Sequence, residues 1–306
     1  MIPSWHQQAR RELIKERRGS SAWSYRRNHV PSVEPTALVC LALLASGDGQ
    51  TSTFDVETSH RAARWLTAIQ RSDGSLPVSE GLPSPGWATP YALLLWSALP
   101  GYEEAESRAR AWLLGREGVV SRIDKNSEKT IGHDPGLVGW PWVEGTHSWL
   151  EPTALAIIAL CQAGLADQRR AQAGVELILD RALEAGGWNY GNTTVFGTDL
   201  RPQPGPTGLA LLALAAAGAR SAVVAQGLTY LGRLARDLRA PISLGWGILG
   251  LRAHDASPDE ADTWLAHACS RCIAKADATV GLALLLLASS EPALGLLITP
   301  SSPRSR

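Results

Sequence analysis

The chain has 306 residues, 45% hydrophobic and 19% charged, a balance typical of a globular protein with enough apolar material for a large core. Its formal net charge is zero, so whole-chain charge gives no reason to expect a nucleic-acid partner. The four cysteines show no disulfide framework, which favours a cytoplasmic location. Twelve tryptophans against two phenylalanines suggest aromatic surfaces that also need a hydrogen-bond donor.

The N-terminal stretch is basic. "ARRELIK" (9–15) has the paired arginines of an export signal, but "ERRGSSAWSYRR" is charged where such a signal needs an apolar stretch, so we expect no signal. Residues 1–30 hold seven Lys/Arg and two Glu, which favours a solvated helix face, with peripheral contact to anionic lipid as the sharper alternative. No apolar run approaches the length of about 18 residues expected of a transmembrane helix.

One short apolar pattern is repeated six times along the chain. Each copy is apolar on every side and about three turns long, so it must be surrounded by other helices. In the first four copies a proline stands at the start, where its fixed φ suits the first helical turn. The copies lie at 34–45, 89–99, 151–160, 205–218, 240–251 and 278–289.

Amphipathic segments alternate with these apolar runs. They lie at 6–18, 61–70, 107–117, 170–184, 226–238 and 259–272. The alternation predicts one all-α domain over residues 1–306, an α6/α6 toroid with six inner and six outer helices. Residues 6–18 would close the outer ring, and 299–306 would form a disordered tail. The inner helices are expected near 36–46, 89–99, 152–163, 206–217, 241–252 and 279–288.

Short motifs between the helices resemble a known superfamily. "QRSDGSL" (70–76) matches the cyclase repeat Q-x-x-D/E-G-x-W, with Leu76 in place of the tryptophan. "LEAGGWNYG" (183–191) keeps its glycine–tryptophan end, and "RGSSAWSY" (18–25) is a weaker echo. The chain thus resembles the α/α toroids of squalene–hopene cyclases and protein prenyltransferase β subunits. The resemblance implies a terpenoid cyclase-like protein that acts on an isoprenoid or other apolar lipid, with a second subunit if it is prenyltransferase-like.

The catalytic sets of these relatives do not carry over. The D-x-D-D acid motif and the D-x-C zinc pair are absent, and "WNYG" (188–191) has Asn189 where zinc-binding lanthipeptide cyclases have cysteine. We therefore expect no metal and no cofactor. A zinc site of His133, Asp134 and His147, all from one loop, is the alternative. Cys269 and Cys272, with His267 nearby, are interpreted as outer-helix core residues.

The candidate site lies in the loops that lead into the inner helices. Residues 117–150 form an unusually long connection, which favours a functional role. The loop at 186–204 adds further polar and aromatic residues. Candidate catalytic residues are His133, Asp134, Glu144, His147 and Glu151. Candidate substrate-binding residues are Trp140, Trp142, Trp149, Trp188, Tyr190, Asn192 and Asp199.

Each candidate also has a structural interpretation. Glu151, like Glu34, can simply favour a helix start, Asp134 can form a turn before Pro135, and Glu144 and His147 can hold the loop's backbone. The chemistry that best suits the set is acid-initiated carbocation chemistry, with Asp134 or Glu144 as the acid and indole faces stabilising the cation. The alternatives are a non-catalytic lipid-binding or partner-docking toroid and a carbohydrate-active toroid.

Overall fold

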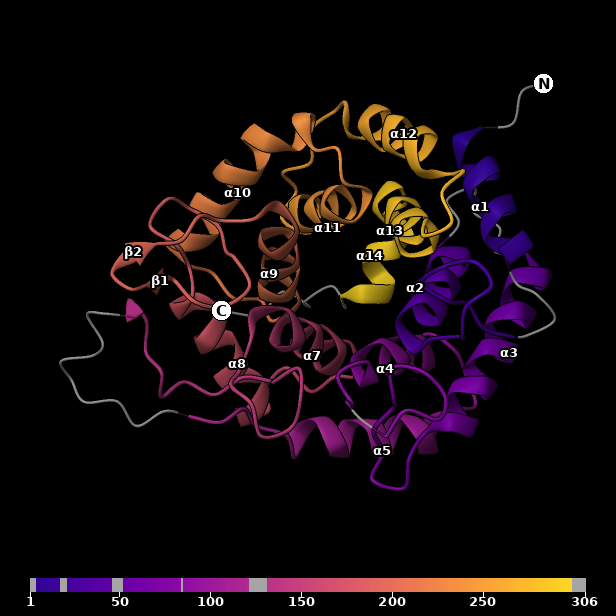
Figure 1. Ribbon diagram of the computed structural model, residues 1–306, viewed down its shortest axis with the longest axis horizontal. Helices are drawn as coiled ribbons and strands as arrows, with labels where there is room; N and C mark the ends of the chain where they lie inside the picture. Colours follow the sequence, from indigo (N-terminus) through magenta and orange to yellow (C-terminus); the bar gives the residue numbers. More distant parts are fainter. Residues whose placement is uncertain (1–3, 17–20, 46–51, 84, 121–130, 299–306) are drawn as a thin grey trace, which may run out of the picture.

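The protein is a closed double ring of helices. A computed structural model describes residues 4–16, 21–45, 52–83, 85–120 and 131–298. Viewed down the ring axis, an inner barrel of helices is surrounded by an outer ring of helices (Figure 1). Each inner helix contacts the next, and α13 returns to α2, while α1 contacts α12 and α13 and so closes the outer ring. The predicted toroid is confirmed.

The inner helices are nearly uniformly buried. They are α2 (Val33–Leu44), α4 (Thr89–Ser97), α7 (Leu150–Gln162), α9 (Pro204–Ala216), α11 (Pro241–Arg252) and α13 (Thr279–Ser289). Each lies within three residues of its predicted position. The match follows from composition, because a short helix without a polar face can exist in water only when other helices cover it on all sides.

The outer helices each present one apolar face to the barrel. They are α1 (Trp5–Glu16), α3 (Thr53–Ile69), α5 (Glu103–Leu114), α8 (Arg169–Asp180), α10 (Ala222–Leu234) and α12 (Ala261–Cys272). A 3₁₀ turn, η1 (Ala235–Asp237), follows α10. The two strands, β1 (Thr194–Val195) and β2 (Thr198–Asp199), form a small antiparallel hairpin between α8 and α9.

The sequence did not predict a seventh apolar helix, α14 (Glu291–Leu297). It contacts α2, α7 and α13 and lies inside the ring in Figure 1. Ser290 donates a hydrogen bond to the Ala45 carbonyl, and Gln162 donates one of 3.1 Å to the Gly295 carbonyl. Because Ala45 and Gln162 end α2 and α7, this helix covers the end of the barrel where the inner helices stop. The predicted tail at 299–306 lies outside the described residues.

Among the described residues, no helix is by itself long and apolar enough to cross a membrane. Together α13 and α14 reach the length and composition, but they are bent by 108° relative to each other.

Three tryptophans join three of the outer helices to the next inner helix in the same way. The indole N–H of Trp23 donates to the Leu13 carbonyl at 2.7 Å, that of Trp140 to Leu113 at 2.9 Å, and that of Trp188 to Ile178 at 2.6 Å. All three acceptors lie in the last turn of an outer helix, where carbonyls lack helical partners.

The backbone N–H of the same tryptophans is also paired. Each donates, at 2.9 Å, to a threonine hydroxyl in the first turn of the next inner helix: Thr36, Thr153 or Thr207. Leu76, which replaces tryptophan in the second repeat, keeps this backbone bond to Thr89. The repeated motif therefore satisfies buried polar groups at four of the six outer-to-inner connections.

Inner helices α9 and α11 approach most closely at two glycines. A Cβ placed on Gly250 would lie 2.4 Å from the Gly208 carbonyl oxygen, and one on Gly208 would lie 2.3 Å from the Trp246 carbonyl oxygen. Neither position can take a methyl group unless the helices move apart.

We expect Gly250→Ala to lower the free energy of unfolding by about 1–3 kcal/mol, because the added methyl overpacks this contact. Gly232→Ala on outer helix α10 is the matched control, since a Cβ added there would have nothing within 4 Å. It should stabilise the protein by about 0.5–1 kcal/mol through helix propensity. Urea denaturation of both variants measures the difference, and equal effects would contradict the close packing.

Candidate functional site

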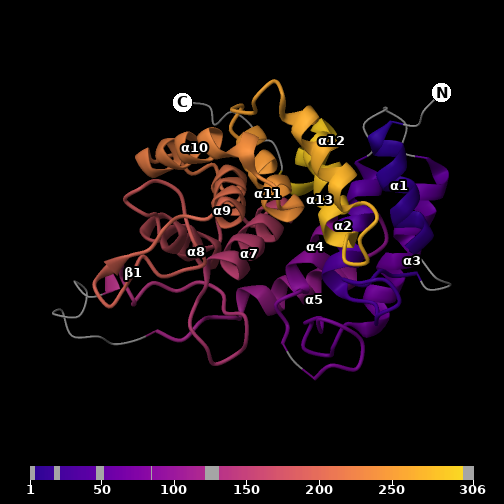
Figure 2. The same cartoon turned by 45° about the horizontal axis from the view of Figure 1, so that its top comes forward.

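The loops that lead into the inner helices gather at one end of the toroid. We call this end the rim, meaning the outer-to-inner connections and the first turns of the inner helices. Figure 2 shows the connections after α3 and α5 and the β1 hairpin on this side. Because outer helices end and inner helices begin at the rim, six connections contribute side chains to one surface.

A cluster of two carboxylates and two phenols lies at the rim. Glu34 begins α2 and accepts a 2.5 Å hydrogen bond from the Tyr25 hydroxyl and a 3.0 Å bond from the Tyr91 hydroxyl of α4. Glu151 lies in the first turn of α7, the inner helix on the other side of α4. Both carboxyl groups are half-buried.

Burial makes these carboxylates unusually weak acids. Burial, and then the charge of Glu34, raise the pKa of Glu151 to about 7. Burial also raises the pKa of Glu34, although its two tyrosine hydrogen bonds oppose the shift. With a pKa of about 7, a substantial fraction of Glu151 is protonated at neutral pH.

An aromatic pocket of about 260 Å³ adjoins this cluster. Its walls include Trp87, Trp112 and Trp142, with Pro152, the residue after Glu151, also lining it. The Trp87 ring meets Trp142 edge-to-face at 5.0 Å and Tyr91 at 6.4 Å, which connects the pocket wall to the Tyr91–Glu34 hydrogen bond.

Charged side chains line the pocket beside these rings. Arg116 lies 5.3 Å from the Trp112 ring centroid and forms ion pairs with Glu144 and, at 3.8 Å, with Asp73. A ligand held there would therefore meet indole rings and a guanidinium whose charge is balanced by two carboxylates.

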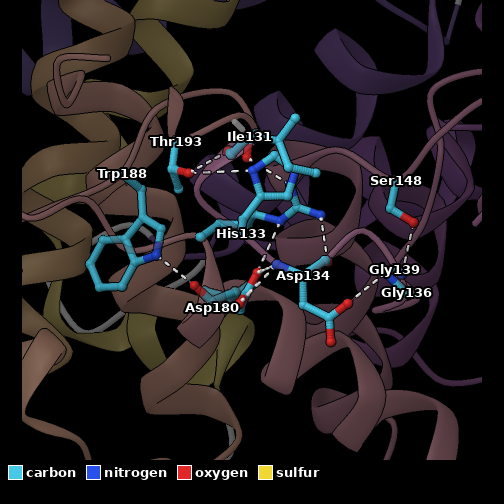
Figure 3. A network of polar contacts seen from close by, with 12 residues as sticks. Ile131, His133, Asp134, Gly136, Gly139, Ser148, Asp180, Trp188 and Thr193 are labelled. Atoms are coloured by element: carbon cyan, nitrogen blue, oxygen red, sulfur yellow. Dashed lines mark hydrogen bonds and ion pairs between the residues drawn. The ribbon is translucent and has the colours of Figure 1, made fainter. Parts of the chain in front are cut away.

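His133 and Asp134, two of the predicted catalytic residues, lie away from this cluster. They pack over the end of outer helix α8, where the Asp134 backbone N–H donates to the Asp180 carboxylate at 3.2 Å and the His133 ring bonds Thr193 at 3.3 Å (Figure 3). Asp134 is exposed and accepts a hydrogen bond from the Gly136 N–H, as a turn former does. Burial, and then the positive charge of Arg181, lower the pKa of His133 to about 4.

Glu144 and His147 are exposed on the long loop. Glu144 pairs with Arg116 at the pocket, whereas His147 bonds the Val119 carbonyl at 3.0 Å. The structure therefore places the five predicted catalytic residues at one end of the toroid. Of these five, Glu144 lines the pocket, and Glu151 is next to the lining residue Pro152.

The predicted aromatic residues divide into core and rim. Trp188 is fully buried and Trp140 is 3% exposed, because their indoles bond the ends of outer helices. We therefore correct the interpretation of Trp188 as a substrate-binding residue, because it has no exposed surface, whereas Trp140 is one of the residues that line the pocket. Trp142 lines it as well.

The remaining predicted binding residues hold the loop structure. Trp149 packs on Gly191, and the Tyr190 carbonyl accepts the Leu150 N–H at 3.0 Å. The Asn192 carbonyl accepts a bond from Asn189, and Asp199 accepts one from Thr194 within the hairpin. Tyr190, Asn192 and Asp199 are exposed, whereas Trp149 is half-buried.

The described residues contain no group of three or more His, Cys, Asp or Glu side chains arranged to hold a metal ion. Cys269 and Cys272 are buried on α12, as interpreted from the sequence.

Sequence reasoning missed Tyr25, Tyr91 and Trp87, and gave Glu34 only a helix-start role. A signal was present: Glu34 and Glu151 both lie two residues before the repeated threonine of their inner helices. Aligning the repeats on that threonine also places Tyr91 where Leu38 and Leu155 stand in neighbouring copies.

Comparisons with known proteins support the fold. No family model matches the sequence, and no curated protein matches it. A variant of the type II terpene cyclase MstE from Scytonema, in complex with geranylgeranyl dihydroxybenzoate, is similar in structure, with a TM-score of 0.58, 15% identity and coverage of 88% of this chain and 77% of that one.

Two further solved structures extend the likeness. The ent-copalyl diphosphate synthase from Streptomyces platensis has a TM-score of 0.52 and 20% identity over 86% of this chain and 50% of its own. The alpha-2-macroglobulin of Salmonella has a TM-score of 0.52 and 14% identity over 92% of this chain and 17% of its own. At these identities the likeness establishes the terpenoid cyclase-like toroid fold, and it leaves activity to be argued from the site.

Proposed function

We propose that the protein is an isoprenoid cyclase or isomerase that starts its reaction by protonating a carbon–carbon double bond. The single observation that carries the proposal is the carboxyl group of Glu151 at the rim, whose pKa is raised to about 7 by burial and then by the charge of Glu34. A carboxylic acid that stays protonated near neutral pH can act as a general acid under ordinary cellular conditions. The fold neighbours, which include two terpene cyclases, favour an isoprenoid as the substrate.

The proposed steps balance as an isomerisation. Glu151 transfers its proton to one alkene carbon, which leaves a tertiary carbocation and a carboxylate. A second double bond attacks the cation and forms a new carbon–carbon bond, or the cation rearranges. Loss of a proton to a carboxylate then regenerates an alkene and the protonated pair, so product and substrate have the same mass.

The rings around the pocket would stabilise the cation. Trp87 and Trp142 present indole surface beside Tyr91, and a desolvated cation over an indole face is stabilised by about 2 kcal/mol or more. Glu34 acts through its charge, which raises the pKa of Glu151 and balances the developing cation. Tyr25 and Tyr91 position Glu34, and their hydrogen bonds favour its charged form.

Turnover in deuterated water tests this proposal. Purified protein is incubated in deuterated water with linear polyprenes of increasing length. Products with the same number of carbon atoms as the substrate are analysed by mass spectrometry. We expect one deuterium fixed on carbon, and we expect Glu151→Gln and Glu34→Gln each to lower the rate by at least about 100-fold.

Two other carboxylates serve as matched controls. Asp134→Asn and Glu144→Gln remove the acids that the sequence suggested, at exposed positions of the same rim. Both should keep most of the activity. If either abolished turnover while Glu151→Gln did not, the proton donor would have to be reassigned to that loop.

A non-catalytic toroid that binds an apolar molecule is the second candidate. The recurrence of the fold within Salmonella alpha-2-macroglobulin favours keeping it, because it shows that the toroid also occurs outside proteins named as cyclases. Lipid extraction followed by mass spectrometry separates the two: a bound polyprene that is never converted supports binding alone.

A further inference from the structure

Arg170 of α8 is a buried cation that the proposed reaction does not use. It is 9% exposed, and it forms no ion pair with any carboxylate of the described residues. Burial lowers its pKa to about 10, so the side chain keeps its charge at neutral pH. Because a buried charge without a partner of opposite sign is costly, a cation at this position indicates a specific role.

The guanidinium of Arg170 binds both sides of the long connection that leads from α5 to α7. Its Nε donates to the Arg116 carbonyl at 2.8 Å, just after α5. Its Nη1 and Nη2 donate to the Val138 and Gly139 carbonyls at 3.3 and 2.7 Å, on the later part of the same connection. The Gly139 carbonyl also accepts the Gly118 N–H at 3.0 Å. One side chain therefore ties the two sides of this connection together.

Arg170 also holds the indole of Trp140. Its guanidinium carbon lies 3.6 Å from the Trp140 ring centroid, which is a cation–π contact shielded from water. One turn further along α8, a Cβ added to Gly174 would lie 2.7 Å from the same ring, so the helix leaves room there for the indole. Trp140 lines the aromatic pocket, and so does Arg116, whose carbonyl Arg170 binds. Arg170 therefore contacts two pocket residues from outside the pocket.

The next connection around the ring shows that seating a tryptophan does not require a cation. Trp188 lies against Gly227 of α10 in the same way, with an added Cβ only 2.6 Å from its ring. One turn before Gly227, at the position that corresponds to Arg170, stands Val223. Trp188 is fully buried and does not line the pocket. The cation therefore accompanies the connection that builds the pocket wall.

We infer that Arg170 is a positioning residue, which fixes Trp140 and Arg116 and thereby sets the shape of the pocket without touching the ligand. Pro141 and Trp142 follow Trp140 directly and also line the pocket, so a displacement of Trp140 moves this whole wall. The inference rests on the proposed function only for the class of ligand, an apolar polyprene. The position of the wall itself can be measured without ligand or turnover.

Fluorine NMR of protein labelled with 5-fluorotryptophan tests the inference. Trp142 is the reporter, because it lines the pocket two residues beyond Trp140, and Trp142→Phe identifies its resonance. We expect Arg170→Met to shift the Trp142 resonance by more than its linewidth and to leave that of Trp188 in place. Arg170→Lys keeps the charge but lacks the fork that reaches three carbonyls, so it should also shift Trp142. A residue that added only stability would leave these folded-state resonances unchanged.

Arg181→Met is the matched control. Arg181 is similarly buried at the end of α8 and also donates to loop carbonyls, those of Gly191 and Asp134, each at 3.4 Å. Its loss should leave the Trp142 resonance in place, and far-UV circular dichroism checks that each variant is folded. An unmoved Trp142 resonance in both Arg170 variants, or an equal shift in Arg181→Met, would overturn the inference.

Steady-state kinetics adds a second readout. If the parent protein converts a linear polyprene, Arg170→Met should raise KM by about 10-fold and lower kcat by less than about threefold, because the wall binds the ligand whereas Glu151 belongs to α7. An unchanged KM would contradict the role assigned to Arg170. A parent protein that converts no polyprene would contradict the proposed reaction alone, because the Trp142 resonance does not depend on turnover.

Discussion

Trp188→Ala is expected to lower the free energy of unfolding by about 3–5 kcal/mol, a large share of the roughly 5–15 kcal/mol that stabilises a typical protein. Trp188 is fully buried, and its indole fills the space beside Gly227, where an added Cβ would lie 2.6 Å from the ring. Removing it opens a cavity between α8, α9 and α10. It also leaves the Ile178 carbonyl without the indole N–H.

Two further variants separate cavity from hydrogen bond. Trp188→Phe keeps most of the volume but loses the N–H donor, so we expect a loss of about 1–2 kcal/mol. Trp142→Ala removes an indole from the half-buried pocket wall and should cost clearly less than Trp188→Ala. Urea denaturation followed by circular dichroism gives all three values. A Trp188→Ala loss no larger than that of Trp142→Ala would show that Trp188 does not join the rings of helices.

Glu151→Gln is expected to make the protein more stable at alkaline pH, although it removes a site residue. The folded-state pKa of Glu151 is about 7, against an ordinary value of 4.5. A carboxyl group whose folded pKa is raised contributes its stability below the unfolded pKa. It loses that stability as pH rises through the folded pKa. The parent protein should therefore lose stability between about pH 4.5 and pH 7.5.

Glutamine has no charge to desolvate, so the variant avoids this loss. Allowing for the half-buried side chain, we expect Glu151→Gln to exceed the parent by about 2 kcal/mol near pH 8 and to differ little near pH 5. Glu144→Gln, at an exposed position of the same rim, should show no such gain. Urea denaturation at both pH values measures it, and a Glu151→Gln curve parallel to the parent's would contradict the raised pKa.

The fold was predictable because its cause is local. Six runs without a polar face, separated by amphipathic segments, leave few arrangements other than two concentric rings, and the structure has that arrangement. α14 escaped prediction because its seven residues are too few to show a period. Its place against α2 and α7 depends on contacts across the ring.

The site was harder to predict because its chemistry depends on which side chains face each other across neighbouring helices. Glu151 was chosen from its loop, but its partner Glu34 lies on α2, on the other side of α4. Tryptophan density pointed to the correct rim. It could not separate Trp142, which lines the pocket, from Trp188, whose indole N–H donates to a carbonyl in the last turn of α8.

The protonation state of Glu151 can be measured directly. In protein labelled with ¹³C at the glutamate side-chain carboxyl, a pH titration by NMR should contain one resonance with a midpoint near 7. This resonance should be absent from Glu151→Gln. In Glu34→Gln its midpoint should move toward the ordinary value of 4.5, because the neighbouring charge is gone. A parent protein whose glutamate resonances all titrate near 4.5 would contradict a proton held at the rim.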